Sequence, residues 1–114
     1  MDDYKNRRWN FNREIDFEPC GLGIQRKILA YTDELMCVEN HFETCSIGAL
    51  HTHPHTQVSY VVSGSFTYIV DGVSRNIHPG DSVLIKDNVL HGLTCQESGI
   101  VLDIFTPMRE DFVK

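Results

Sequence analysis

The chain has 114 residues, which suits one compact domain, and hydrophobic residues make up 41% of them, which is enough for a single core. Its 10 basic and 16 acidic residues give a net charge of -6 without any block rich in Lys and Arg, so nucleic acid is not expected as a partner. No stretch approaches the roughly 20 apolar residues that span a bilayer, and the N-terminus lacks the apolar core of a signal peptide, so we expect a cytoplasmic protein without membrane contact.

Short segments rich in β-branched and aromatic residues, separated by Gly, Asp, Asn or Pro, are typical of strands. In chain order the predicted strands cover residues 27–31, 35–42, 51–62, 65–70, 74–77, 82–85, 92–96 and 99–106. The predicted reversals lie at 63–64, 71–72, 79–81 and 87–88, and a short helical turn is predicted around 109–112. Eight short strands in one small domain favour an all-β sandwich or a barrel that closes its own edges.

The cysteines carry no sign of a metal knuckle or of a disulfide framework. They form no CxxC pair and there is no secretory context. We predict four reduced thiols, none of them promoted to a metal ligand by its spacing: Cys20, Cys37, Cys45 and Cys95.

The stretch HTHPHTQ places His51, His53, His55 and Gln57 at every second position. If the stretch is extended, these side chains share one face, because the side-chain period of a strand is two residues. Same-face neighbours have Cα atoms about 6.5 to 7 Å apart, so two imidazoles can reach one ion. Pro54 disturbs the strand after the first pair, which leaves the direction of His55 open between a pocket-lining residue and a displaced ligand.

A metal site in a β-barrel also needs a donor from a distant strand, and His91 is placed to supply it. It begins the segment HGLTC, after the turn at 79–81, so a neighbouring strand can bring it to face His51 and His53. The alternative is a solvent-exposed loop without metal, and the third histidine with both turn motifs favours the metal. His41 and His78 have no such support, and we interpret them as surface or structural residues.

Most of the segment 35–106 resembles the two motifs of the cupin superfamily. The resemblance lies in the order of Gly48, His51, His53, Gln57, Gly64, the turn at 79–81 and His91. The resemblance implies a double-stranded β-helix, or jelly-roll barrel, that holds one divalent metal. We expect a single cupin domain over 1–114, with an N-terminal arm and first strand at 1–30, the barrel core at 31–106 and a C-terminal tail at 107–114.

The superfamily usually has glutamate where this chain has Gln57. A neutral amide leaves the dication its full charge, which favours a Lewis-acid role over oxygen activation. Three imidazoles and one amide oxygen suit zinc, nickel, iron or manganese.

The closing segment LDIFTPMREDF holds a second group of polar and aromatic residues. In a strand Asp103 and Phe105 share a face, and Pro107 ends the ladder so that Arg109 can return over the barrel mouth. On its own this segment is more typical of a strand that ends in a solvated, charged tail.

HxHxHxQ with a closing DxFxPxRxDF is similar to the KdgF-type proteins, small cupins that linearise 4,5-unsaturated uronates released by pectate and alginate lyases. Met108 departs from a second proline that is common in these tails. The resemblance implies that four residues bind the metal, namely His51, His53, Gln57 and His91. It further implies that Asp103, Phe105 and Arg109 match active-site residues of that family. Our hypothesis is that Asp103 transfers a proton, Arg109 pairs with the substrate carboxylate and Phe105 packs on the sugar ring.

Two other classes of protein share the same expected fold and metal. One is a non-catalytic cupin that senses a sugar or a metal, and the other is a metal-dependent dioxygenase or isomerase for another small molecule. The aromatic N-terminal segment WNFNREIDF predicts either a homodimer, in which it crosses onto a second copy, or an arm whose Trp9, Phe11 and Phe17 cover their own barrel.

Overall fold

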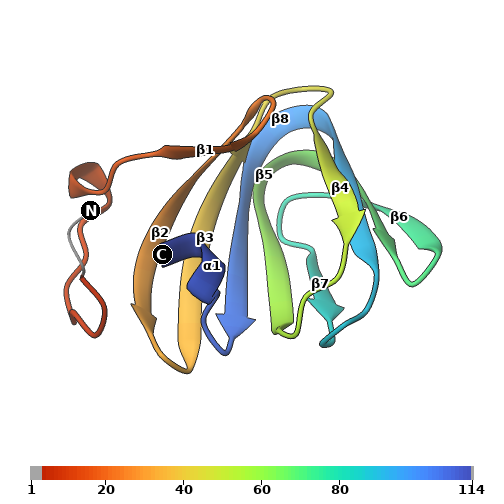
Figure 1. The fold of residues 1–114 in the computed structure, drawn as a ribbon. Helices are drawn as coiled ribbons and strands as arrows, with labels where there is room; N and C mark the ends of the chain where they lie inside the picture. Colours follow the sequence, from red (N-terminus) through yellow and green to blue (C-terminus); the bar gives the residue numbers. More distant parts are fainter. Residues whose placement is uncertain (1–3, 114) are drawn as a thin grey trace.

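A computed structural model describes residues 4–113 of the protein, and these residues form an almost entirely β structure (Figure 1). Its elements are the 3-10 helix η1 (Asn12–Glu14), the strands β1 (Glu18–Gly21), β2 (Ile24–Thr32), β3 (Leu35–Phe42), β4 (Ile47–His51), β5 (Thr56–Val70), β6 (Val73–Ile77), β7 (Ser82–Ile85) and β8 (His91–Thr106), and the helix α1 (Glu110–Val113). The all-β prediction is confirmed. Neither helix of this part of the chain has the length and apolar character needed to cross a membrane.

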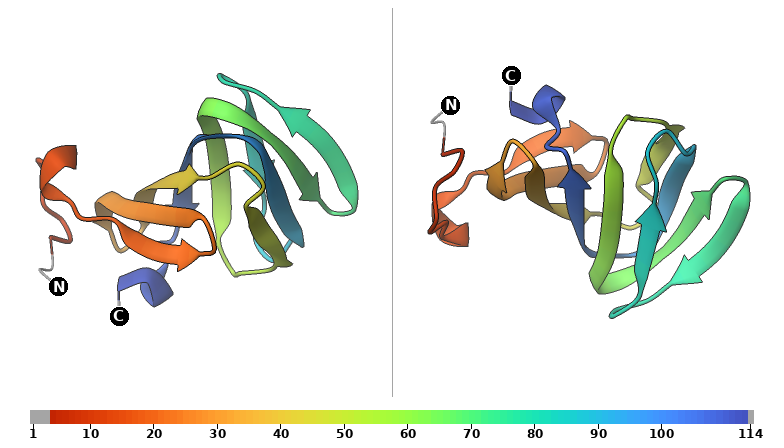
Figure 2. Two further views of the ribbon diagram at one scale, coloured as in Figure 1. Left: turned by 90° about the horizontal axis from the view of Figure 1, so that it is seen from above. Right: turned by 90° about the horizontal axis from the view of Figure 1, so that it is seen from below.

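The eight strands form one antiparallel sheet in the order β1-β2-β3-β8-β5-β6, with β4 paired to β8 and β7 paired to β5. β5 and β8 pair from Thr56 with Thr106 at one end to Val70 with His91 at the other. Both strands are long and strongly bent, so the sheet curls around an interior (Figures 1 and 2). The two strands thereby connect the part of the barrel formed with β2 and β3 to the part formed with β4, β6 and β7.

The predicted reversal at 63–64 is wrong, because β5 continues through Gly64. Gly64 has a φ of +82°, and a Cβ there would lie 2.5 Å from the carbonyl oxygen of Glu97. Opposite it, a Cβ on Gly99 would lie 2.0 Å from the carbonyl oxygen of Ser63, in the middle of the continuous strand β8. The two glycines therefore let two bent strands pass in close contact, and the four strands predicted here are two long ones.

Tight turns predicted elsewhere are present. Asp71 and Gly72 have φ values of 51° and 80°, as a two-residue hairpin turn requires. The turn at 79–81 and the one at 87–88 are also formed, and the helical turn predicted at 109–112 is α1. The pattern missed β1 and most of β4, which are four and five residues long.

Two apolar clusters fill the barrel, and polar side chains separate them. One cluster is formed by Ile28, Tyr31, Met36, Val38 and Phe105. The other is formed by Ile24, Phe42, Val61, Phe66, Tyr68, Ile77, Ile85, Cys95 and Val101. Along the inner face of β3, Asn40 stands between Val38 and Phe42, and on β8 Asp103 stands between Val101 and Phe105. The polar layer lies at the level where the candidate site forms.

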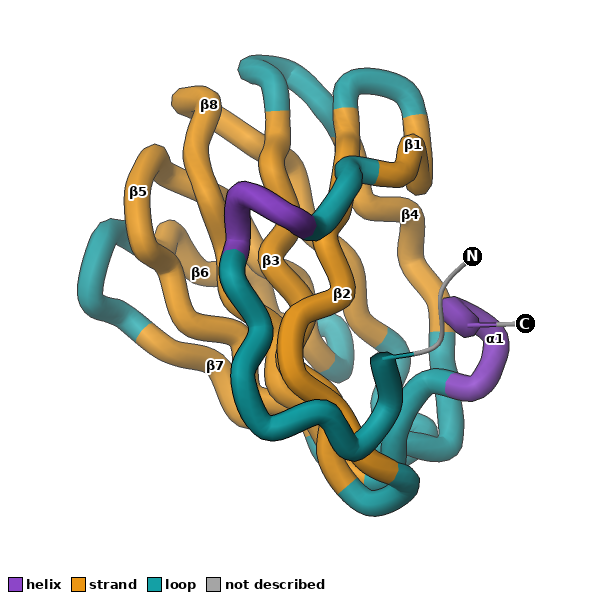
Figure 3. Tube along the Cα trace, turned by 90° about the vertical axis from the view of Figure 1, so that its left-hand side faces the viewer, coloured by secondary structure: helices purple, strands orange, loops and turns teal. Residues whose placement is uncertain are grey.

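The N-terminal segment runs along the outer side of β2 (Figure 3). The backbone N–H of Asn6 donates to the carbonyl of Tyr31 at 2.9 Å, and the Nζ of Lys27 donates to the carbonyl of Asn12 at 3.0 Å. All four cysteines are free thiols, as predicted.

Candidate functional site

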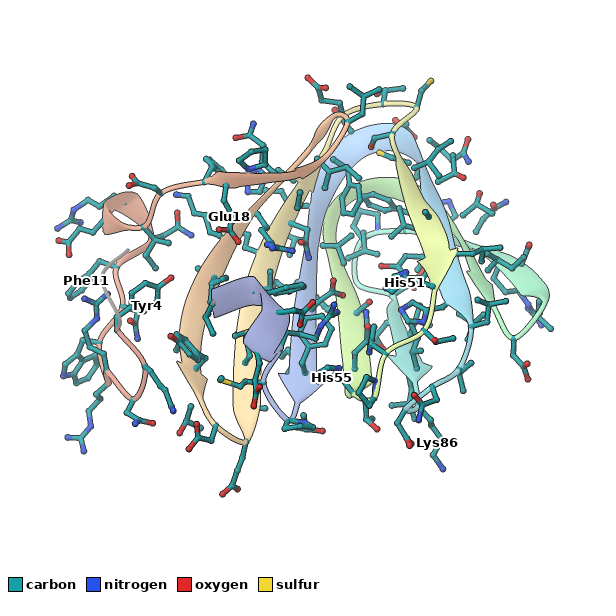
Figure 4. The ribbon with its side chains drawn as sticks, in the orientation of Figure 1. Tyr4, Phe11, Glu18, His51, His55 and Lys86 are labelled. Atoms are coloured by element: carbon teal, nitrogen blue, oxygen red, sulfur yellow. The ribbon has the colours of Figure 1, made fainter. Side chains whose placement is uncertain are left out.

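Three histidines meet at one end of the polar layer, and together they are called the histidine cluster: His51, His53 and His91. His51 is the last residue of β4 and pairs directly with His91, the first residue of β8. One nitrogen atom from each ring lies within 4.8 Å of the others. In Figure 4 the side chain of His51 lies beside the end of β4, and His55 lies near the start of β5. This cluster could hold a metal ion.

The prediction that 51–62 forms one strand is wrong for its first part. Residues 52–55 form the loop between β4 and β5, so no single strand carries His51, His53 and Gln57 on one face. The rings converge for two other reasons. Cross-strand pairing sets His51 opposite His91, and the loop turns His53 into the barrel, where only 7% of its surface is exposed.

Backbone carbonyls orient two of the three rings. The Nδ1 of His51 lies 2.8 Å from the carbonyl oxygen of Ala49, and the Nδ1 of His91 lies 2.8 Å from that of Val89. A carbonyl accepts only from an N–H, so Nδ1 carries the proton in the neutral form of both rings, and Nε2 then has the lone pair. The Nε2 of His91 is buried without a hydrogen-bond partner among the described residues. Rings held in this way are ready to bind a metal.

Gln57, on β5, joins the histidine cluster to an acid. Its Oε1 lies 2.9 Å from the Nε2 of His53. An amide oxygen only accepts, so without an ion this contact is a hydrogen bond from the ring N–H, and the same two atoms lie close enough to become ligands of one ion. The Nε2 of Gln57 donates to the Oγ of Ser59 at 3.1 Å and to Asp103 Oδ1 at 3.2 Å.

The surroundings of His53, His55 and His91 favour their neutral forms. Burial lowers the pKa of His53 to about 4, and the positive charge of Arg109 adds to the effect. Burial also lowers the pKa of His91 and of His55. Neutral imidazoles keep the lone pair that metal binding requires.

Asp103 is held between β3 and β5 by three side chains, and these four residues are called the carboxylate network. Asn40 Nδ2 donates to its Oδ2 at 2.9 Å, and Ser59 and Gln57 donate to its Oδ1. Burial raises the pKa of Asp103 to about 6, while the hydrogen bonds from Ser59 and Gln57 oppose that rise. A carboxyl group that titrates there can both give and accept a proton near neutral pH.

Arg109 follows β8 and returns over the barrel, as predicted. Its guanidinium lies 5.2 Å from the ring centre of Phe105 and 4.3 Å from that of Phe112. Nε and Nη2 donate to the two carboxylate oxygens of Asp111, at 3.0 and 2.8 Å. The pairing with Asp111 was not predicted.

One cavity of about 420 Å³ connects these groups, a volume that suits a small ligand. Six of the seven predicted site residues line it, and the seventh, His53, contacts both His91 and Gln57 beside it. The lining members are His51, Gln57, His91, Asp103, Phe105 and Arg109.

Sequence patterns missed four further lining residues: Arg26, Asn40, Tyr68 and Phe112. Asn40 had a signal, since it alternates with the apolar residues Val38 and Phe42. No sequence pattern pointed to Arg26 or Phe112. These two residues are far apart in the sequence, and the fold alone brings the guanidinium of Arg26 to 3.6 Å from the ring centre of Phe112.

The remaining histidines lie outside the cluster. The Nε2 of His41 lies 2.6 Å from a carboxylate oxygen of Glu39, and His78 is exposed, which agrees with the structural and surface roles predicted for them. The ring of His55 lies 5.1 Å from that of His53 and 6.3 Å from that of Phe105, centre to centre. His55 is not one of the three histidines that converge.

Comparison with known proteins agrees with this fold. Residues 41–105 match the cupin domain family, so the chain belongs to the cupins. Within them it belongs to the KdgF family, because it is 40% identical to the pectin degradation protein KdgF of Dickeya dadantii (strain 3937), over 94% of this chain and 99% of that protein. The resemblance predicted from the motifs is confirmed.

Two solved structures extend the comparison. An RmlC-like cupin from Shewanella frigidimarina NCIMB 400 has a TM-score of 0.92 and 39% identity, over 96% of this chain and 99% of that one. KdgF from a Halomonas species has a TM-score of 0.88 and 37% identity, over 91% of this chain and 96% of that one.

Proposed function

We propose that this protein linearises 4,5-unsaturated uronate monosaccharides to 5-keto-4-deoxyuronates during the breakdown of pectin or alginate. The observation that carries the proposal is that a histidine cluster and a titratable carboxyl group line one cavity and are joined by Gln57. Two relatives named KdgF, one of them a pectin degradation protein, support it.

His51, His53, Gln57 and His91 would hold one divalent cation, zinc, nickel, iron or manganese, in this proposal. The convergence of the three imidazoles and the 2.9 Å separation between His53 and Gln57 support that ligand set. Such an ion, when bound, polarises oxygen atoms of the substrate.

The reaction is an isomerisation that needs one proton transfer to carbon. The substrate is a cyclic enol ether, and opening of its hemiacetal breaks the bond between carbon 1 and the ring oxygen, leaving an aldehyde and an enol. The enol becomes the 5-keto product when carbon 4 gains a proton and the oxygen on carbon 5 loses its hydroxyl proton. Asp103 is proposed to deliver the proton to carbon 4, and such acid/base help is typically worth about 10² to 10⁴ in rate.

Arg109 and Phe105 would position the sugar acid. Asp111 engages Nε and one N–H of Nη2, which leaves the two N–H groups of Nη1 and the other one of Nη2 to donate to the substrate carboxylate. Phe105 lines the same cavity and offers an apolar face for the sugar ring.

An absorbance assay tests the proposal. Purified protein is mixed with unsaturated uronate monomer, and loss of the ultraviolet absorbance of the conjugated alkene is followed. Acceleration over buffer is expected, and a rate equal to buffer would refute linearisation. Oxygen uptake with a catechol or thiol substrate would favour a dioxygenase, and binding of the sugar acid without turnover would favour a sensor. Elemental analysis identifies the metal.

We also propose a single cupin domain over 1–114 that works as a homodimer in the cytoplasm. Trp9 is 72% exposed and Phe11 is 53% exposed, so the N-terminal segment offers an apolar surface to a second copy. Val58, Leu84 and Ile104, which are neighbours across β7, β5 and β8, add exposed apolar area on the outer face of the sheet. Light scattering of the purified protein measures the state, and a monomeric mass would refute the dimer.

A further inference from the structure

Tyr68, on β5, has a buried hydroxyl group without a hydrogen-bond partner among the described residues. The residue is 3% exposed, and its ring packs in the apolar cluster that contains Phe66. Burying a hydroxyl without a partner costs free energy, so native proteins rarely leave one unpaired. This oxygen therefore needs an explanation.

The hydroxyl belongs to a group of buried polar atoms without partners. In the part of the chain that the structure describes, the other buried side-chain nitrogens and oxygens without a partner are ring nitrogens of His53, His55 and His91. All of these atoms belong to residues at or beside the same cavity, and Tyr68 itself lines it. Unpaired polar atoms gathered around one cavity are typical of a site that a ligand completes.

Within the protein, the Ser59 hydroxyl lies close enough to affect the pKa of Tyr68, but the two groups do not meet hydrogen-bond geometry. The Oγ of Ser59 donates to Asp103 and accepts from Gln57. Burial, together with the negative charge of Asp103, raises the pKa of Tyr68, so the phenol stays protonated and can donate. A buried donor on a residue that lines the cavity, next to a carboxyl group, is suited to an oxygen atom of a bound molecule.

We propose that the Tyr68 hydroxyl donates a hydrogen bond to an oxygen of the bound sugar acid. This assignment rests on the proposed function and adds a binding residue that the histidine and tail motifs do not contain. Sugar acids carry several hydroxyl and carboxylate oxygens that accept hydrogen bonds. Tyr68 would hold the sugar from the buried side of the cavity, and Arg109 would hold its carboxylate near α1.

The substitution Tyr68→Phe tests the proposal, because it removes only the hydroxyl and keeps the ring in the core. For the metal-loaded protein we expect KM for unsaturated uronate to rise about 3- to 10-fold, as loss of one neutral hydrogen bond implies. The melting temperature should stay equal or rise, since an unpaired hydroxyl has been removed. Tyr60→Phe is the matched control, because Tyr60 lies on the same strand but is 44% exposed on the outer face.

A second measurement separates this proposal from the proposed reaction. Titration calorimetry with galacturonate, a saturated uronate, measures binding without turnover, and Tyr68→Phe should weaken it by a similar factor. That result would uphold the Tyr68 assignment even if the wild type failed to linearise the unsaturated sugar. Equal affinity and KM in the variant and the wild type would overturn the assignment, and so would a lower melting temperature, which would show that the hydroxyl is paired inside the protein. A wild type that binds neither uronate would overturn both proposals.

Discussion

The histidine cluster and the carboxylate network lie side by side in one cavity, and they differ in how their polar atoms are satisfied. Buried ring nitrogens of His53 and His91 have no partner among the described residues, whereas both oxygens of Asp103 accept hydrogen bonds from side chains. The first region is built for a ligand from outside the chain, and the second is held in place by the chain itself. Gln57 is the residue that contacts both.

Of the variants considered, His53→Ala is expected to have the largest effect on metal binding and activity. It removes one of three converging imidazoles, so bound metal measured by elemental analysis should fall sharply, and uronate linearisation should approach the rate in buffer. The exposed His78 supplies the control, and His78→Ala should keep full metal content and activity. Unchanged metal content in His53→Ala would show that the cluster is not the metal site.

Asp103→Asn should distinguish the role of the carboxylate network from that of the histidine cluster. The amide keeps the size of the carboxyl group but cannot transfer the proton, so kcat should fall by about 10² to 10⁴. Metal content should remain that of the wild type, because no nitrogen of the histidine cluster donates to Asp103. Loss of metal in this variant would mean that the two regions are one coordination site.

Asn40→Ala tests how far the carboxylate network depends on its own hydrogen bonds. The variant loses the bond to Asp103 Oδ2, and hydrogen bonds to charged groups contribute about 1.5–3 kcal/mol. We expect kcat to fall about 10- to 100-fold, as for other residues that orient a reacting group. Chemical denaturation measures the loss of stability, and steady-state kinetics measures the fall in kcat. Asn40→Asp is a contrasting variant, because it adds a like charge beside Asp103. Wild-type kcat in Asn40→Ala would remove Asn40 from the proposed positioning role.

Asp111→Asn should have the smallest effect. The Asp111 side chain is 59% exposed, although that of Arg109 is 11% exposed, and ion pairs screened by solvent contribute about 0.2–1 kcal/mol to the free energy of unfolding. We expect a change of that size, a modest rise in KM because Arg109 is less firmly held, and no change in kcat. A large fall in kcat would instead place Asp111 among the reacting groups.

Local signals in the sequence predicted some turns correctly and misjudged others. Asp71-Gly72 forms the expected hairpin, because two adjacent residues with positive φ define that turn by themselves. Gly64 also has a positive φ, yet it lies within a continuous bent strand. A glycine marks either a reversal or a close backbone approach, and only the opposing Gly99 decides between them.

The candidate site shows the same division. The spacing of His51, His53 and His91 indicated a metal cluster, and the structure brings the three rings together. The expected cause, alternation along one strand, is wrong, because His53 lies in a loop and His51 meets His91 across two strands. No sequence pattern indicated that Tyr68 would line the cavity that holds Asp103.

The sequence alone determined the all-β character, the set of metal-binding and acid/base residue types, and the KdgF resemblance, because periodicity and short motifs are local properties of the chain. The tertiary structure decided which of those side chains meet. Strand register sets His51 opposite His91 and Ser59 opposite Asp103 over some forty residues of chain. Register depends on bulges, bends and the packing of both barrel faces at once, so residues that are distant in sequence come together only when the whole sheet has closed.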